Sequence, residues 1–165
     1  MATLQRVTPF LWFDKQAEEA AKFYVSIFPG SRIVKTSHYP NAGQEVHHKP
    51  AGSVMVVVFE LDGVEFSAIN GGTAFKLNEA VSFVVNCDSQ AEVDRYWDAI
   101  LKHGGKPQAC GWIIDKFGLR WQIHPSVLGK MLADPDKAKA ARAMKEMLKQ
   151  VKFDIAKLEA AFHGK

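Results

Sequence analysis

Two side chains in this sequence are candidates for a general base. His124 carries an imidazole and Glu65 a carboxylate, and either group can accept a proton from a bound molecule. A lone histidine is more often a satisfied structural residue, so both roles stay open for His124. Cys87 and Cys110 are the two thiols, and neither belongs to a C-x-x-C pair or has a basic neighbour in sequence. We therefore expect reduced, partly buried thiols and keep His124 and Glu65 as the catalytic candidates.

Other charged residues have less defined roles. His47 and His48 lie in the irregular stretch 40–50, which contains Gly and Pro and is expected to be a loop. Solvation is the simpler interpretation of these two histidines, and a role in a lid is the alternative. Glu65 and Arg120 have two open interpretations: a structural ion pair, which we favour, or recognition of a charged substrate.

An internal repeat organises the elements that would position these side chains. Residues 14–18 (D-K-Q-A-E) recur 74 residues later at 88–92 (D-S-Q-A-E), with four of five positions identical. Each copy follows a short apolar strand and leads into a helix for which Asp14 or Asp88 is the predicted N-cap. At the same spacing Thr8 falls on Ser82, Phe13 on Cys87, and Gly30 on Gly104. A repeat of this length indicates two copies of one supersecondary unit.

Each copy is predicted to be a βαβββ module. The first module has strands at 7–13, 31–39, 53–61 and 64–69 and a helix from 14 to 30, with a hairpin turn at Asp62-Gly63. The second has strands at 80–87, 107–112, 113–116 and 119–124 and a helix from 88 to 102. We expect an α+β fold in which residues 1–125 form paired modules, at about 4–72 and 80–125, with incurved mixed sheets.

After Pro125 the pattern becomes helical. Residues 137–151 and 154–162 are rich in Ala, Leu, Met and Lys, and apolar residues recur at helical spacing. Residues 126–165 are therefore predicted to form a C-terminal helical extension. Its Met-rich stripe is expected to serve packing or an interface.

Strand alternation predicts which side chains share one face of the two sheets. Successive residues of a strand point to opposite faces. Aromatic walls with a few placed polar groups are typical of a small-molecule pocket, and barrel-lining residues with satisfied hydrogen bonds are the alternative. The predicted ligand-binding residues are Thr8, Phe10, Trp12, Glu65, Ser67, Ser82, Arg120 and Gln122, with His124 on the same face.

Composition excludes several classes of partner. The net charge of +3 is too small to indicate binding to nucleic acid or to an anionic membrane. The sequence has no secretory signal and no apolar run near the ~20 residues that a membrane-spanning helix needs. We expect a cytoplasmic protein of 165 residues whose partner is a small molecule.

Several motifs resemble one branch of the vicinal oxygen chelate superfamily, the PhnB-like or 3-demethylubiquinone 3-methyltransferase-like proteins. The superfamily includes glyoxalase I, extradiol dioxygenases, and bleomycin- and fosfomycin-resistance proteins. The segments that carry the resemblance are 8–14 (T-P-F-L-W-F-D), 18–20 (E-E-A), 23–24 (F-Y), 28–30 (F-P-G), 66–72 (F-S-A-I-N-G-G), 110–112 (C-G-W), 115–118 (D-K-F-G), 121–123 (W-Q-I) and 153–161 (F-D-I-A-K-L-E-A-A). This resemblance implies paired βαβββ modules and a homodimer, for which the Met-rich helix would supply apolar surface.

The resemblance also implies where a metal would bind. Metal-using members place His, Glu or Gln at one strand-start and one last-strand position of each module. Here those positions hold Thr8, Ser67, Ser82 and Gln122, which are three hydroxyls and one amide. Transition metals in proteins prefer imidazole, thiolate or carboxylate, so we expect no metal and no other cofactor.

The leading hypothesis is a protein that binds a small molecule in a cavity between its modules without a metal. One alternative is a lyase, isomerase or dioxygenase with a divalent metal held by His124, Glu65 and a loop histidine. The methyltransferase label is a further, disfavoured alternative. A nucleotide-type cofactor would call for a glycine-rich turn between a strand and a helix, and Gly71-Gly72 does not open a convincing helix.

Overall fold

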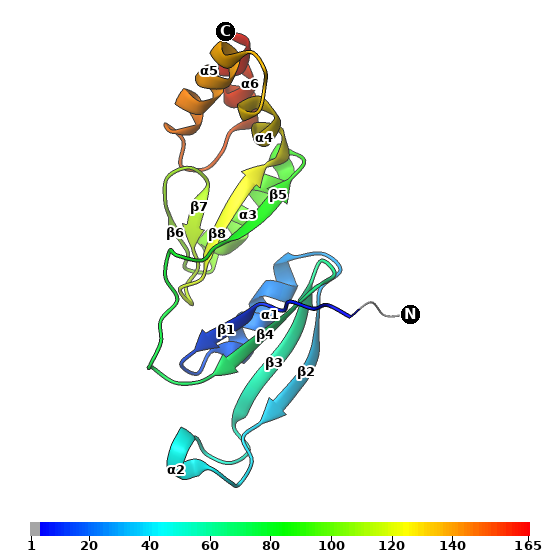
Figure 1. Cartoon of the computed structure of the whole chain (residues 1–165), viewed down its shortest axis with the longest axis vertical. Helices are drawn as coiled ribbons and strands as arrows, with labels where there is room; N and C mark the ends of the chain where they lie inside the picture. Colours follow the sequence, from blue (N-terminus) through cyan, green and yellow to red (C-terminus); the bar gives the residue numbers. More distant parts are fainter. Residues whose placement is uncertain (1–3) are drawn as a thin grey trace. The chain divides into compact units, whose positions relative to one another are not determined.

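The computed structural model describes residues 4–165, and these form two compact units, one up to Lys76 and the other from Leu77 to the end. The first three residues of the expected 1–125 pair lie outside the described residues. Each unit begins with a strand, a helix and three further strands (Figure 1). The α+β class and the two βαβββ modules are therefore confirmed.

Unit 1, up to Lys76, is a four-stranded mixed sheet with one helix across a face (Figure 1). The strand order is β1-β4-β3-β2, with β1 parallel to β4 and the other neighbours antiparallel. The elements are β1 (Phe10–Phe13), α1 (Ala17–Ile27), β2 (Arg32–His38), α2 (Gln44–His47), β3 (Val54–Leu61) and β4 (Val64–Asn70). The stretch 40–50, expected to be a loop throughout, thus contains one helical turn, α2.

The core of unit 1 lies between α1 and the sheet. Ala17, Ala20 and Ala21 are fully buried, and such small side chains let the helix approach the strands closely. The bulk is supplied by Tyr24 and by Phe59, whose rings lie 6.0 Å apart. The β3–β4 hairpin turns at Asp62 and Gly63 with φ values of 47° and 80°, the left-handed conformations expected of an Asp-Gly turn.

Both helix starts differ from the prediction. The residue that precedes α1 is Gln16 and not Asp14, and the amide of Ala17 donates instead to Oδ1 of Asn70 over 2.8 Å. The cap is thus supplied by a residue 53 positions away, which local sequence rules do not detect. In the second unit Ser89, not Asp88, is the N-cap, because its hydroxyl accepts from the amide of Glu92.

Unit 2, from Leu77 onward, repeats the arrangement in the order β5-β8-β7-β6. Its elements are β5 (Phe83–Cys87), α3 (Gln90–Lys102), β6 (Lys106–Pro107), β7 (Trp112–Ile114) and β8 (Arg120–Pro125). The predicted strand 107–112 was too long. Cys110 and Gly111 have φ values of 57° and 75°, and their amides donate to the carbonyls of Gln150 and Val151.

The C-terminal extension belongs to unit 2 and contains α4 (Ser126–Leu132), α5 (Lys137–Met147) and α6 (Ile155–His163). Leu128, Met131, Ala143, Phe153 and Leu158 form its core. Helix α4 was missed by the sequence pattern. Helix α5 ends at Met147 and not at 151, because the following segment bonds to residues 110–111. Among the helices of residues 4–165, none is long and apolar enough to cross a membrane.

The two sheets match residue by residue. Phe10 stands opposite Ser67 in the parallel β1–β4 pair, and Val84 stands opposite Gln122 in the β5–β8 pair. Val84 follows Phe10 by the repeat spacing of 74 residues, and Gln122 follows Ser67 by 55. The register therefore makes Ser67 and Gln122 structurally equivalent.

Candidate functional site

Each sheet has one face turned away from its helix, here called the helix-distal face. On β4 the buried Phe66, Ala68 and Asn70 alternate with half-buried residues that face away from α1. On β8 the buried Trp121, Ile123 and Pro125 alternate in the same way. The helix-distal face of unit 1 comprises Phe10, Trp12, Val56, Val58, Glu60, Glu65, Ser67 and Ile69; that of unit 2 comprises Val84, Asn86, Trp112, Ile114, Arg120, Gln122 and His124.

Phe10 and Ser67 lie side by side on the helix-distal face of unit 1. Phe10 is 59% exposed, although it lies within a strand. On the other side of Ser67 stands Val58 of β3. The row Val58–Ser67–Phe10 thus combines an aliphatic, a hydroxyl and an aromatic side chain, which suits a small organic molecule.

Trp12 is held rigidly at the end of the same face. Its indole nitrogen donates to the carbonyl of Gly72 over 2.8 Å, and its ring contacts Phe75 edge-on with centroids 4.9 Å apart. Gly71 is required here, because a Cβ at that position would come within 2.2 Å of the Trp12 ring. The indole is therefore an apolar wall, since its hydrogen-bond donor is already used.

Thr8 and Glu65 lie near the start of β1 and β4. Gln5 links them, because its side-chain amide donates to the Glu65 carbonyl over 2.9 Å and to the Thr8 hydroxyl over 3.4 Å. Glu65 stands opposite Glu60, which pairs with Arg32 over 3.0 Å. Among the described residues the Glu65 carboxylate has no hydrogen-bond partner, so it is available to a ligand.

Gln122 and Ser82 meet on unit 2. Nε2 of Gln122 donates to the Ser82 hydroxyl over 2.9 Å. Trp112 of β7 stands directly opposite Gln122, and paired residues of adjacent strands project from the same face. The row Trp112–Gln122–Val84, with Ser82 beside it, is the unit 2 counterpart of Val58–Ser67–Phe10.

Arg120 is engaged within unit 2. Its guanidinium pairs with Glu79 at 2.5 Å, donates to the Leu77 carbonyl over 3.0 Å, and also contacts the Gly118 carbonyl. Its side chain is 12% exposed. These contacts fix the segment before β5 to the start of β8, which is a structural role.

His124 follows Gln122 on the same face of β8. Its ring meets Phe153 of the extension edge-on, with centroids 6.2 Å apart. Burial lowers the pKa of His124 below its ordinary value, so the imidazole is neutral at pH 7. A neutral imidazole can accept a proton, which is the requirement for a general base.

The structure adds residues to the predicted set. Trp112 and Asn86 flank Gln122 and His124, and Val58 and Ile69 complete the face of unit 1. Asn86 could have been found at the repeat spacing of 74 residues from Trp12. Trp112 could not, because the β7 boundary was misplaced.

Cys87 and His47 have contacts that indicate structural roles. Burial, together with the nearby Glu92 and Asp88 carboxylates, raises the pKa of the Cys87 thiol to about 12, so it is not an activated nucleophile. The His47 ring lies against the Tyr39 ring, with centroids 4.6 Å apart and planes tilted by 37°, and its Nδ1 accepts from the amide of Lys49 over 3.0 Å. His47 therefore shapes its loop.

The side chains at the four positions where the superfamily resemblance implies metal ligands do not suit a metal ion in this chain. Within unit 1 they are Thr8 and Ser67, and within unit 2 they are Ser82 and Gln122, all neutral. The amide nitrogen of Gln122 donates to Ser82, and its oxygen is the one amide oxygen among these positions, a neutral and weak ligand for a transition metal. Among residues 4–165 no group of three or more His, Cys, Asp or Glu side chains is placed to hold a metal ion.

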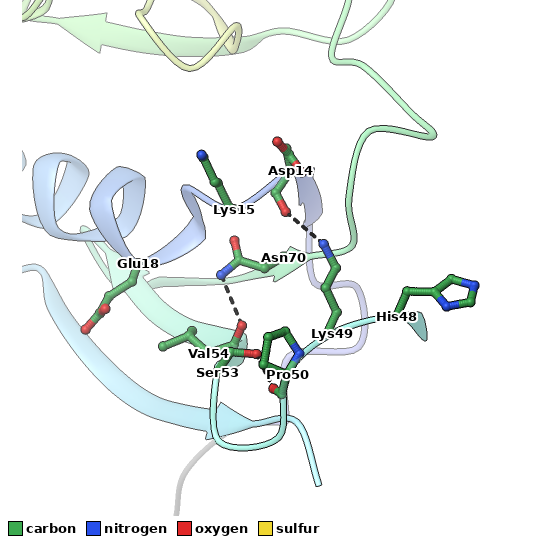
Figure 2. A pocket seen from close by; sticks show the side chains of 9 residues that line it. All are labelled: Asp14, Lys15, Glu18, His48, Lys49, Pro50, Ser53, Val54 and Asn70. Carbon is green, nitrogen blue, oxygen red and sulfur yellow. Dashed lines mark hydrogen bonds between the residues drawn. The ribbon is translucent and has the colours of Figure 1, made fainter. Parts of the chain in front are cut away.

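A concave region lies on unit 1, beside the start of α1, and has a volume of about 500 Å³. Its lining residues are Asp14, Lys15, Glu18, His48, Lys49, Pro50, Ser53, Val54 and Asn70 (Figure 2). Nζ of Lys49 lies 3.4 Å from the Asp14 carbonyl oxygen, and Glu18 pairs with Lys22 over 2.9 Å. None of the predicted site residues lines this cavity, and its charges are of both signs.

Comparison with solved structures finds proteins whose fold is similar to that of the paired modules. A "putative 3-demethylubiquinone-9 3-methyltransferase, PhnB protein" from Bacillus cereus is 31% identical over 74% of this chain and 100% of its own, with a TM-score of 0.65. Protein PA1353 from Pseudomonas aeruginosa is 21% identical over 74% of this chain and 98% of its own, with a TM-score of 0.59. The fosfomycin resistance protein FosX from Mesorhizobium loti is 15% identical over 81% of this chain and 100% of its own, with a TM-score of 0.56.

No curated protein matches the sequence. The family model described as 3-demethylubiquinone-9 3-methyltransferase matches residues 5–124, which include both modules and end where the helical extension begins. The chain therefore belongs to this PhnB-like family of the vicinal oxygen chelate superfamily.

Proposed function

We propose that the protein binds an uncharged or weakly charged small organic molecule on the helix-distal faces of its sheets, without a metal. The observation that carries the proposal is the matched register of the two units. The equivalent residues Ser67 and Gln122 each have an aromatic neighbour, which is Phe10 on the parallel strand in unit 1 and Trp112 on the antiparallel strand in unit 2. Such a combination holds a ligand by apolar contact and orients it by a few hydrogen bonds.

The family description names a methyltransferase, but the residues offer no support for that activity. A nucleotide-type cofactor commonly rests on a glycine-rich turn that leads from a strand into a helix. Here Gly71 and Gly72 follow β4, and the described residues 71–82 contain no helix before β5. Methyl transfer is therefore not proposed.

A thermal-shift screen of chelator-treated protein against small metabolites tests the proposal. A ligand that binds the folded state raises the melting temperature in proportion to the logarithm of its concentration. Phe10→Ala should weaken binding on unit 1 about tenfold, since an aromatic contact contributes on the order of 1.4 kcal/mol. Val46→Ala is the control, because Val46 is 78% exposed and lies on α2, away from the face.

If every ligand found in the screen required added metal, the proposal would be wrong. It would also be wrong if binding survived Phe10→Ala and Trp112→Ala unchanged. The screen therefore separates a metal-independent binding protein from a metalloenzyme of the same fold.

A further inference from the structure

The donor and acceptor pattern at Gln122 and Ser82 is specific. The amide nitrogen of Gln122 donates to the Ser82 oxygen over 2.9 Å, so Oε1 of Gln122 remains an acceptor. The Ser82 hydroxyl accepts that bond and keeps its own hydrogen, so it remains a donor. Within the described part of the chain, neither Gln122 Oε1 nor the Ser82 hydrogen has another partner. The pair thus presents one acceptor and one donor close together.

A hydroxyl group complements this pattern, because it donates one hydrogen and accepts another. A carboxylate does not, since it has only acceptors and would face the Gln122 oxygen. An ether or a carbonyl could accept from Ser82 but would leave the Gln122 oxygen unpaired, which is costly when buried.

The charges of the unit 2 face agree with an uncharged ligand. Arg120 is the cation on this face, and its guanidinium is engaged by Glu79 and by two carbonyls. His124 is neutral at pH 7, because burial lowers its pKa. A charged ligand would therefore lose its hydration without meeting an available opposite charge.

Trp112 supplies the remaining recognition element. It stands opposite Gln122 in the β7–β8 register, so an aromatic ring whose hydroxyl reaches Gln122 would lie near the indole face. Val84 stands on the other side of Gln122 and is 49% exposed, which adds an apolar contact. The row therefore favours a flat ring over a saturated one.

We propose that Trp112, Gln122 and Ser82 form a site for a neutral phenolic compound, whose hydroxyl donates to Gln122 Oε1 and accepts from Ser82. This inference rests on the proposed function and adds to it the chemical class of the ligand. The phenolic group stays neutral at pH 7, since its pKa is near 10 as in tyrosine. No bond is made or broken in this binding step.

The experiment is a titration of the chelator-treated full chain, followed through the Gln122 side-chain amide and the Trp112 indole resonances by NMR. The probe is 4-methylphenol, compared with 4-methylanisole, 4-methylcyclohexanol and 4-methylbenzoate. We expect 4-methylphenol to bind about tenfold more tightly than 4-methylanisole, which cannot donate to Gln122. The cyclohexanol should bind several-fold more weakly than the phenol, and the benzoate most weakly.

Gln122→Met keeps the size of the side chain and removes its polar group, so it should abolish the preference for the phenol over the anisole. Gln44→Met, on the exposed helix α2, is the matched control and should preserve that preference. Equal binding of phenol and anisole by the wild-type chain would overturn the inference, and that comparison needs no variant to fold. Persistence of the preference in a folded Gln122→Met would overturn it too.

Failure of the inference is distinguishable from failure of the proposed function. If 4-methylanisole or another uncharged compound without a hydroxyl bound best and moved the Trp112 resonance, the ligand class would be wrong and the binding function would stand. If no compound of the wider screen perturbed either helix-distal face, both would be wrong.

Discussion

The amide nitrogen of Gln122 lies 2.9 Å from the hydroxyl of Ser82, at the positions that Ser67 and Thr8 occupy in unit 1. Both pairs lie at the strand positions where the resemblance to the vicinal oxygen chelate superfamily implies metal ligands. In unit 2 the pair is joined by a hydrogen bond between neutral groups. It is therefore suited to orient a polar organic group and not to replace the hydration shell of a metal.

Ser82→Ala should lower the free energy of unfolding by about 1 kcal/mol, because it removes the acceptor of the Gln122 amide. Denaturant unfolding measures the loss, and the Gln122 side-chain resonance should move as its partner disappears. Ser26→Ala, at an exposed hydroxyl of α1, is the control and should stay within about 0.5 kcal/mol of the wild type. An unchanged Gln122 resonance would show that the bond is not formed in solution.

Asn70→Ala should destabilise unit 1 by about 2–3 kcal/mol. The buried amide caps α1 through Ala17 and donates to the Val54 carbonyl over 3.1 Å, so its removal leaves two backbone groups without partners. Equilibrium unfolding in urea provides the measurement, with Asn41→Ala at an exposed position as the comparison. Similar stabilities of the two variants would refute the capping role.

Gly71→Ala and Gly129→Ala should have opposite effects. A Cβ at Gly71 would come within 2.2 Å of the Trp12 ring and should cost about 1–3 kcal/mol by displacing it. A Cβ at Gly129 meets no atom within 4 Å, so alanine in helix α4 should stabilise by about 0.5–1 kcal/mol. Thermal unfolding of both variants, with near-ultraviolet circular dichroism to follow Trp12, tests the pair. An unaffected Gly71→Ala would contradict the close packing of Trp12, and a destabilised Gly129→Ala would contradict the open space beside Gly129.

His124 should make unit 2 less stable as the pH falls. Burial lowers its pKa in the folded chain below the ordinary value of about 6.5, so the unfolded chain takes up the proton first. The free energy of unfolding is therefore not reduced by His124 above about pH 6.5. It decreases as the pH falls from there toward the pKa of His124 in the folded chain. His124→Gln should flatten this part of the stability curve, while His38→Gln at an exposed position should not. An NMR titration of His124 with a midpoint above 6.5 would contradict the argument.

The repeated module could be predicted from sequence because local rules determine most of it. The 74-residue repeat, the Asp62-Gly63 turn and the alternation along β4 and β8 all depend on near neighbours. The features that depend on long-range contacts could not be predicted from local sequence. The cap of α1 comes from Asn70, and the end of β6 depends on backbone bonds from Cys110 and Gly111 to the extension.

In the candidate site, too, local sequence patterns predicted some residues, and long-range contacts determined others. Phe10, Ser67 and Gln122 could be assigned to one face of their sheets by alternation alone. The engagement of Arg120 by Glu79 could not, because it depends on the path of the chain before β5. Trp112 was missed because it was assigned to the end of the preceding predicted strand, 107–112, whereas it is the first residue of β7.

The most direct test is calorimetric titration of chelator-treated protein with the best ligand of the screen, repeated after addition of Mn²⁺, Zn²⁺ or Ni²⁺. We predict the same dissociation constant with and without metal, together with resonance changes at Phe10 or Trp112. Binding that appeared only after metal addition, and that was lost in Ser67→Ala or Gln122→Ala, would contradict the central claim.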